Sequence, residues 1–407
     1  MKLWLRSILV FTLAAIAPFA APVAKEPPKN LPINPPPKAS FLGPLRDSPT
    51  NVQAYCSLES RCRLQQYVQQ MGVCALFVIK GRTIRVEMYN EKEICGEGAN
   101  GRDKDYGVAS MAKSLTSTLL GQVLAEKYHL RTQSQFEAVL NRRVGSFLGL
   151  SDRMKLAEGY ATVTLDRLLS MRSDIQWLET GSLPIFSDSV MFDNQVRLPH
   201  RKQSLIGFAS KYRRRSGNPP GHFNYSALDT AMAVPVAVNL SSVRALLKAF
   251  EKGVWAKIGA AHPASWNVDI NGDPIGPCCF KARIDDMARF GTFVLDKGQG
   301  KIPAAWFDLA TAPLDSRFVG LEDESNPADE SCTLGYGYFW WLRKNRPDYF
   351  AYGRYGQFVH IYPEDDVVVV QFSDWNAVPV EKHARCIALK SHDAIVLGLR
   401  GWRYPPS

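Results

Sequence analysis

The chain has 407 residues, of which 46% are hydrophobic and 22% are charged, and its formal net charge is +10. This composition is typical of a globular protein with a substantial core, and it excludes a disordered or fibrous chain. The positive charge is spread thinly along the sequence, so it does not indicate a nucleic-acid partner.

The first 24 residues are typical of a secretory signal. Basic residues precede an apolar run from Ser7 to Ala21, and a small residue, Ala24, follows. The run is shorter than the roughly 20 residues that cross a bilayer, but Pro18 and Pro22 interrupt the usual cleavage pattern. We therefore predict a periplasmic or secreted protein, with an uncleaved N-terminal anchor in the inner membrane as the alternative.

Proline is frequent from residue 25 to residue 50, which predicts an extended tether before a folded domain at 51–407. All eight cysteines lie in this domain, and an even number in an exported chain indicates disulfides of unknown pairing. Adjacent cysteines such as Cys278 and Cys279 rarely bond to each other. No cysteine or histidine group has metal-ligand spacing, so we predict neither a metal site nor another cofactor.

The hydrophobic pattern changes twice along the domain. Residues 51–70 could form a helix, and two β-rich runs in residues 73–90, joined at Lys80-Gly81, predict a hairpin. From about 109 to 250 the apolar residues recur at helical spacing, beginning with an amphipathic helix after Ser110.

Aromatic and β-branched runs at 334–343, 349–363 and 366–375 then predict strands, and residues 382–399 predict a closing helix. This order predicts an α/β (α+β) fold. Both ends of the domain, 51–108 and about 250–407, would build one sheet, and 109–250 would form a helical insertion.

Ser110 and Lys113 are the candidate catalytic pair. They lie three residues apart at the start of the predicted helix, so they share one face of its first turn. A serine attacks a carbonyl only after losing its proton, which a neutral lysine can accept. Neutralising an ordinary lysine at pH 7 costs roughly 4.6 kcal/mol, so a working site must bury this lysine or place another cation beside it. Chance spacing on a helix surface is the alternative.

Six stretches follow one another in the chain: SMAKSLTSTLLG, LLSMRSDIQW, PPGHFNYSALDT, DDMARFGTFVLDKG, GYGYFWW and GRYGQFVHIYPEDDVVVV. In this order they resemble the serine hydrolases related to class C β-lactamases, a group that includes esterases, D-amino-acid peptidases and 6-aminohexanoate-dimer hydrolases. The resemblance covers roughly residues 55 to 400. It implies a β-lactamase/transpeptidase-like fold, with an antiparallel sheet flanked by terminal helices and a mostly helical insertion.

The resemblance also implies roles for single residues. Ser110 matches the acylated nucleophile, Lys113 the lysine that helps to deprotonate it, and Tyr225 the tyrosine that shares the acid and base work. A core tyrosine is the alternative for Tyr225. Ala227 stands where β-lactamases carry an asparagine, which argues against β-lactamase activity and leaves ester or amide hydrolysis open.

Arg354, Tyr355 and Gly356 stand where the family has Lys-Thr-Gly on a strand lining the site. Arg354 would then disfavour a protonated lysine and bind a substrate carboxylate, or it would be a solvated charge at a strand edge. Gly356 would let the substrate approach the strand closely. The resemblance implies that the backbone N–H groups of the nucleophile and of Gln357 form the oxyanion hole.

Other candidates are weaker. Trp177 would line the substrate pocket or pack in the core. His222 or His360 could complete a catalytic triad, although a structural role is expected for both. The basic stretch SKYRRRSG at 210–217 would be a solvated loop, or it would attract anionic substrates.

The sequence therefore predicts an exported serine hydrolase that cleaves carboxylic esters or small amides through an acyl-enzyme. Its partners would be small-molecule esters, amides or peptides, and it would contact a membrane only through an N-terminal anchor. Two alternatives stay open. One is a D-amino-acid peptidase, penicillin-binding protein or β-lactamase, and the other is a catalytically silent scaffold or binding protein.

Overall fold

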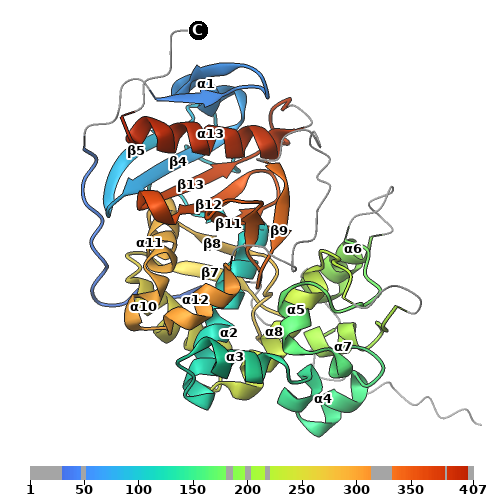
Figure 1. Ribbon diagram of the computed structural model, residues 1–407. Coiled ribbons are helices and arrows are strands. Elements are labelled where there is room, and N and C mark those ends of the chain that lie inside the picture. Colours follow the sequence, from blue (N-terminus) through green and yellow to red (C-terminus); the bar gives the residue numbers. More distant parts are fainter. Residues whose placement is uncertain are drawn as a thin grey trace, which may run out of the picture.

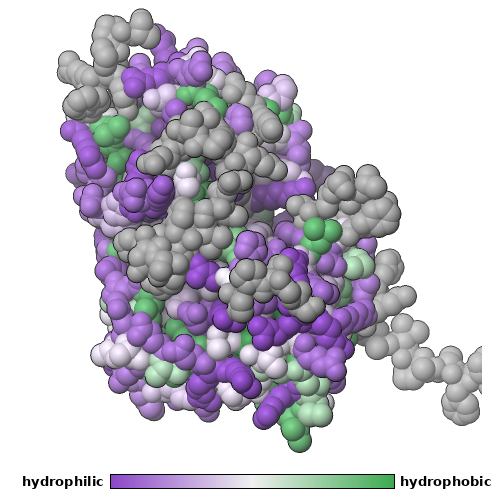
Figure 2. Space-filling view, turned by 45° about the vertical axis from the view of Figure 1, so that its right-hand side comes forward, coloured by the Kyte–Doolittle hydropathy of each residue, from purple (hydrophilic) through white to green (hydrophobic). Residues whose placement is uncertain are grey.

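A computed structural model describes residues 30–46, 52–179, 187–197, 203–215, 221–312, 332–380 and 383–401. The expected signal or anchor in the first 24 residues lies outside these ranges. Within them, no helix is long and apolar enough to cross a membrane. On the face shown in Figure 2, hydrophilic residues predominate and hydrophobic residues are scattered.

A seven-stranded antiparallel sheet forms the upper part of the molecule (Figure 1). Its order is β5 (Thr83–Tyr89), β4 (Val73–Lys80), β13 (Val367–Ser373), β12 (Gln357–Tyr362), β11 (Tyr349–Gly353), β10 (Trp341–Arg343) and β9 (Leu334–Tyr336). Strands β4 and β13 come from opposite ends of the chain and pair with Val78 opposite Val369. The prediction that both ends build one sheet is confirmed.

Helices cover both faces of this sheet (Figure 1). Helices α1 (Leu64–Gln70) and α13 (Ala384–Leu399) pack on one face, where Val68, Ile387 and Val369 share a buried cluster. Helix α11 (Ile284–Leu295) lies on the other face, and a Cβ on its Gly291 would come within 2.5 Å of Val368. All seven residues of β13 are buried because both faces of the sheet are covered.

A smaller sheet corrects the predicted tether. It has the order β1 (Asn30–Ile33), β7 (Ala264–Asn267), β8 (Phe280–Ala282) and β6 (Tyr106–Gly107). Strand β1 belongs to the proline-rich stretch at 25–50, yet it pairs along its whole length with β7, with Leu31 opposite Trp266. Extended backbone suits a proline-rich segment at a sheet edge, so this part of the stretch is a strand rather than a free tether.

The predicted helix at 51–70 is also only partly correct. Strands β2 (Gln53–Tyr55) and β3 (Arg61–Arg63) form a hairpin, and the helix α1 begins at Leu64. A disulfide between Cys56 and Cys62 closes this hairpin. The cross-link brings together residues that would lie along one helix, and it therefore excludes a helix through the segment.

The helical insertion fills the lower part of the molecule (Figure 1). It comprises α2 (Ala112–Tyr128), α3 (Gln133–Leu140), α4 (Leu150–Lys155), α5 (Leu165–Leu169), α6 (Asp188–Phe192), α7 (Leu205–Ala209), α8 (Ala227–Leu240) and α9 (Leu246–Phe250). The short α10 (Ala256–Ile258) follows it, and α12 (Ala304–Ala310) follows α11.

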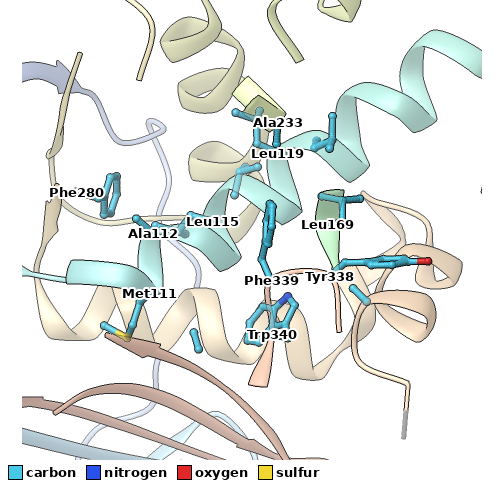
Figure 3. Packing of buried hydrophobic residues seen from close by; sticks show 14 of the residues in the cluster. Met111, Ala112, Leu115, Leu119, Leu169, Ala233, Phe280, Tyr338, Phe339 and Trp340 are labelled. Atoms are coloured by element: carbon cyan, nitrogen blue, oxygen red, sulfur yellow. The ribbon is translucent and has the colours of Figure 1, made fainter. Parts of the chain in front are cut away.

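Helix α2 is the central element, and it is not amphipathic as predicted. Every residue from Ala112 to Ala125 is buried, as expected for a helix enclosed on all sides. Met111, Ala112, Leu115 and Leu119 pack among side chains of other elements, including Phe339 (Figure 3). This enclosure fixes the start of α2, where Ser110 and Lys113 lie.

All eight cysteines are paired: Cys56–Cys62, Cys74–Cys95, Cys278–Cys279 and Cys332–Cys386. Disulfides persist in oxidising compartments and are rare in the cytosol. The four bonds therefore indicate an extracytoplasmic protein. The bond between the neighbours Cys278 and Cys279 corrects the expectation that they would not pair.

Candidate active site

Ser110 and Lys113 face each other at the start of α2. Ser110 lies in the 3₁₀ turn Ala109–Met111, and Lys113 lies in the first turn of the helix. Lys113 Nζ is 2.9 Å from Ser110 Oγ, and the lysine is only 2% exposed. Among the residues that the structure describes, no carboxylate pairs with Lys113. The hydrogen-bond partners of its amine are the Ser110 hydroxyl and the Pro277 carbonyl.

The turn that carries Ser110 has an unusual backbone. Ala109 has a φ of +46°, a left-handed value that alanine rarely adopts. Gly353, at the end of β11, packs directly on this turn, because a Cβ there would lie 2.5 Å from the Val108 carbonyl oxygen and 3.0 Å from the Ala109 Cβ. A side chain at 353 would therefore push the nucleophile turn away. Sequence reasoning missed Gly353, although the Gly-x-x-Gly spacing with Gly356 was visible.

Tyr225 lies beside Lys113. The lysine Nζ is 4.8 Å from the centre of the tyrosine ring, which is within cation–π range for an ammonium. The ring stacks on Trp341 at 5.4 Å and meets Tyr336 edge-on at 5.9 Å. The side chains predicted to be catalytic thus lie together, and Tyr225 is only half-buried.

The residues that stand for Lys-Thr-Gly form the turn between β11 and β12. Arg354 is exposed, and its guanidinium lies 4.8 Å from the Tyr355 ring. Tyr355 and Gly356 have φ values of +69° and +92°. A Cβ on Gly356 would lie 2.5 Å from the Trp375 ring, so this glycine permits the turn and its contact with the indole. The expected effect of Arg354 on the lysine stays a prediction.

Gln357 begins β12 immediately after this turn. Its side-chain amide donates to the Arg354 carbonyl at 3.2 Å and to the Ser373 carbonyl at 2.6 Å, and it accepts from the Ser373 N–H at 3.3 Å. These bonds fasten the turn to the end of β13. They hold the backbone of Gln357, whose N–H is the expected oxyanion donor, in a fixed position.

A carboxylate that sequence reasoning missed lies near Tyr225. Glu179 Oε2 accepts from the Ala227 N–H at 2.7 Å and from Trp177 Nε1 at 2.5 Å. Ala227 is the first residue of α8, where the helix dipole favours an anion. No motif contains Glu179, so its position depends on the folded loop. At the site where β-lactamases have an amide, this chain has Ala227 and an acceptor-only carboxylate.

Trp177 is 3% exposed, and its segment lines a pocket of about 520 Å³. Asn224, next to Tyr225 in the chain, donates to the Trp177 carbonyl at 3.0 Å, but the candidate catalytic side chains themselves do not line this pocket. The other lining residues are Gln176, Leu178, Asp188, Lys211, Tyr212, Arg213 and Arg215. The predicted basic stretch therefore contributes to this pocket; residues 216 and 217 lie outside the described residues.

The disulfide of Cys278 and Cys279 lies beside the lysine. The carbonyl oxygen of Pro277 accepts from Lys113 Nζ at 3.3 Å. Both cysteines are half-buried, and Cys279 has a φ of +72°. No sequence motif includes this cysteine pair, and it comes to lie against α2 only in the folded protein.

Neither candidate histidine contacts Ser110 in the described residues. His360 is fully buried and bonds to Asp348 at 2.9 Å and to His392 at 3.1 Å. Burial lowers the pKa of His360, although Asp348 opposes this effect. Arg343 pairs with the same aspartate at 3.1 Å, so the cluster is a buried structural network.

One group in the described residues has the spacing of metal ligands, His262 with Asp285 and Asp286. Arg289 already bonds to both carboxylates at 2.8 Å, and the Ala261 N–H donates to Asp286 at 2.6 Å. Because a cation occupies this cluster already, it fits a structural role better than a metal site.

These features match one known family over most of the chain. The family model described as beta-lactamase matches residues 63–390. The chain belongs to the β-lactamase family. It is therefore a member of a family of serine hydrolases, as the order of its motifs predicted.

Solved structures support the fold of this β-lactamase-family protein. A protein from Bacillus anthracis described as a 6-aminohexanoate-dimer hydrolase superposes with a TM-score of 0.72 at 17% identity, over 91% of each chain. A penicillin-binding protein from Bacillus halodurans gives 0.55 at 13% identity, over 83% of this chain and 99% of that one.

EstCE1, a hydrolase with promiscuous acyltransferase activity, also gives 0.55 at 13% identity, over 82% of this chain and 96% of its own. Among curated proteins, none matches. The family match and these superpositions establish the β-lactamase/transpeptidase-like fold, with its seven-stranded sheet and helical region. The identities are low, so the substrate has to be argued from the site.

Proposed function

We propose that the protein is a serine hydrolase that cleaves carboxylic esters or small amides through an acyl-enzyme on Ser110. The contact of 2.9 Å between Lys113 Nζ and Ser110 Oγ, made by a lysine that is 2% exposed, carries this proposal. A pair with chance spacing would leave the ammonium in water, because burying a charge without a counter-ion is costly.

In the first half of the reaction, the neutral amine of Lys113 takes the proton from Ser110 Oγ as the oxygen attacks the substrate carbonyl. The negative charge on the carbonyl oxygen is bound by the backbone N–H groups of Ser110 and Gln357. The tetrahedral intermediate collapses when the leaving group receives a proton, which Lys113 supplies with help from Tyr225. The acyl group then remains on Ser110.

In the second half, water replaces the leaving group. The amine of Lys113, which is neutral again, takes a proton from the water as the water attacks the acyl carbonyl, and it returns a proton to Ser110 Oγ as the acid is released. Both halves need a proton carrier beside Ser110. We assign this role to Lys113, whose Nζ is 2.9 Å from Ser110 Oγ. Neither step calls for an organic cofactor.

Ester or amide hydrolysis is favoured over β-lactam hydrolysis by the surroundings of Ala227. The asparagine of β-lactamases can donate a hydrogen bond to a substrate carbonyl, whereas Glu179, which bonds to the Ala227 N–H, can only accept. The disulfides together with the N-terminal sequence support export, as a periplasmic or secreted protein or with an anchor in the inner membrane.

A substrate panel tests this proposal. Short 4-nitrophenyl esters, ω-amino-acid amides, D-alanyl peptides and a chromogenic cephalosporin would be incubated with the wild type and with Ser110→Ala. We expect turnover of esters or amides by the wild type and none by Ser110→Ala. Turnover of the cephalosporin instead would identify a β-lactamase, and turnover of only the D-alanyl peptides a peptidase. Equal turnover by the two proteins would refute the assignment of Ser110.

A further inference from the structure

The Cys278–Cys279 bond lies next to the candidate general base, and no step of the proposed reaction uses it. We propose that this bond positions Lys113 through the carbonyl of Pro277, so that the enzyme is fully active when the pair is oxidised and impaired when it is reduced. The inference rests on the proposed function, since it assigns a positioning role to residues around the same lysine.

The orientation of the Lys113 amine depends on the groups around its Nζ. A neutral amine has two N–H bonds and one lone pair, and the lone pair must point at the hydroxyl of Ser110 to accept its proton. Pro277 offers a carbonyl oxygen at 3.3 Å, and the ring of Tyr225 lies at 4.8 Å. When one N–H points at Pro277, the amine is held in the rotation that aims its lone pair at Ser110.

The disulfide constrains that carbonyl through the backbone. The carbonyl of Pro277 belongs to the peptide group that joins it to Cys278, and the bond between Cys278 and Cys279 closes a small ring that restricts the backbone at this point. Within the ring Cys279 keeps a φ of +72°, which a residue with a side chain rarely adopts. A reduced pair has no covalent reason to keep this conformation.

Hydrogen bonds act on the ring as well as on the loop around it, and the Cys278 N–H, which shares its peptide group with the Pro277 carbonyl, donates to the Ile275 carbonyl at 3.3 Å. Trp266 Nε1 donates to the carbonyls of Ile275 and Cys278, each at 2.8 Å, and the Asn267 N–H donates to the Cys279 carbonyl at 3.1 Å. These bonds come from β7 and keep the segment against the fold. The segment therefore stays in place after reduction, and the change we expect is a local shift of the Pro277 carbonyl that contacts Lys113.

Reduction of this bond is chemically simple. A dithiol transfers two electrons and two protons, the sulfur–sulfur bond breaks into two thiols, and the dithiol becomes a disulfide. Both cysteines are half-buried, so a small dithiol can reach them. The pair Cys56 and Cys62 is also half-buried but lies in the β2–β3 hairpin, which makes it a matched control.

The experiment measures the rate at which a fluorophosphonate probe labels Ser110 as a function of pH. It compares oxidised wild type, wild type with dithiothreitol, Cys278→Ala/Cys279→Ala and Cys56→Ala/Cys62→Ala. A fifth sample, the Cys278→Ala/Cys279→Gly protein, accommodates a positive φ without the bond and serves if the alanine variant unfolds. Circular dichroism confirms that each protein is folded.

We expect loss of the Cys278–Cys279 bond to lower the plateau rate about 10- to 100-fold, because small misplacements of a catalytic group have effects of this size. We also expect the pH of half-maximal labelling to fall, because a protonated lysine loses a carbonyl acceptor. The Cys56→Ala/Cys62→Ala protein should match the wild type and still respond to dithiothreitol.

Three results would overturn the inference. Equal plateau and equal pH profile in the proteins with and without the bond would show that it positions nothing. A lower plateau with an unmoved profile would show only a general loss of structure. Absence of labelling in the oxidised wild type would reject the proposed function as well, so the two failures are distinguishable.

Discussion

Asp229 is a buried carboxyl group in the first turn of α8, and replacing it should flatten the pH dependence of stability. It is 0% exposed, and its Oδ1 accepts from Tyr160 at 2.7 Å and from Ser173 at 2.8 Å. Its Oδ2 has no hydrogen-bond partner among the described residues. Burial is the largest influence, and it raises the pKa of Asp229 from 3.8 to about 7. The proton is therefore held more tightly in the folded protein than in the unfolded chain.

The linkage between proton binding and folding gives the sign and the size of the effect of Asp229 on the free energy of unfolding. Because the folded pKa is raised, the contribution of Asp229 to stability is fully present below pH 3.8 and is lost as the pH rises through about 7. With these two pKa values, the free energy of unfolding contributed by this group falls by about 2.5 kcal/mol between pH 5 and pH 8. An asparagine side chain does not titrate, so the Asp229→Asn protein lacks this loss.

The assay is urea unfolding of the wild type and of Asp229→Asn at pH 5, 6, 7 and 8, with the disulfides intact. Other groups titrate in both proteins, so the difference between the two curves isolates Asp229. We expect the wild type to lose about 2.5 kcal/mol more than Asp229→Asn over this range. Parallel curves would refute the reasoning and show that the buried carboxyl does not carry a raised pKa.

Three further predictions concern the lysine base, the buried ion network and the central helix. Lys113→Ala should lower the rate of ester turnover about 10²- to 10⁴-fold, the range for loss of a general base; unchanged turnover would exclude Lys113 as the base. Arg343→Leu should reduce the free energy of unfolding by about 1–3 kcal/mol, because Asp348 and Asp393 lose a buried cation while Arg346 still pairs with both; no measurable loss in urea unfolding would contradict this. Gly121→Ala should destabilise despite a gain of about 1 kcal/mol in helix propensity, because its Cβ would lie 2.4 Å from the Trp306 ring; a raised melting temperature would contradict it.

Features set by local spacing could be predicted from the sequence. Ser110 and Lys113 lie three residues apart, so a single helical turn brings them together wherever the helix packs. The strand at β13 could be predicted because its run of β-branched residues is continuous and a turn signal precedes it. The resemblance to the family then supplied Tyr225, which the structure places beside Lys113.

Features that depend on distant partners could not be predicted. Strand β1 pairs Asn30 with Asn267, and no pattern in a proline-rich stretch indicates such a partner. The need for Gly353 arises only because β11 ends against Val108. Glu179 reaches the start of α8 through a loop without a motif. For the same reason, the neighbours Cys278 and Cys279 gave no sign that they lie beside the lysine.

The amphipathic pattern expected for α2 failed for a related reason. Periodicity distinguishes one face of a helix from the other, but it does not show how many elements surround it. Ser114 Oγ donates to the Phe339 carbonyl at 2.7 Å, and Thr116 Oγ1 donates to the Gly276 carbonyl at 2.9 Å. The hydroxyl groups that suggested a polar helix face in the sequence are therefore buried, and they bond to carbonyls of other segments.

The most direct test of the account is the site of acylation. The oxidised wild type and Ser110→Ala would be incubated with a fluorophosphonate probe, and the intact mass and the labelled peptide would be determined by mass spectrometry. We expect one adduct, located on Ser110, in the wild type and none in Ser110→Ala. Labelling of both proteins to the same extent, or an adduct on a different residue of the wild type, would contradict it.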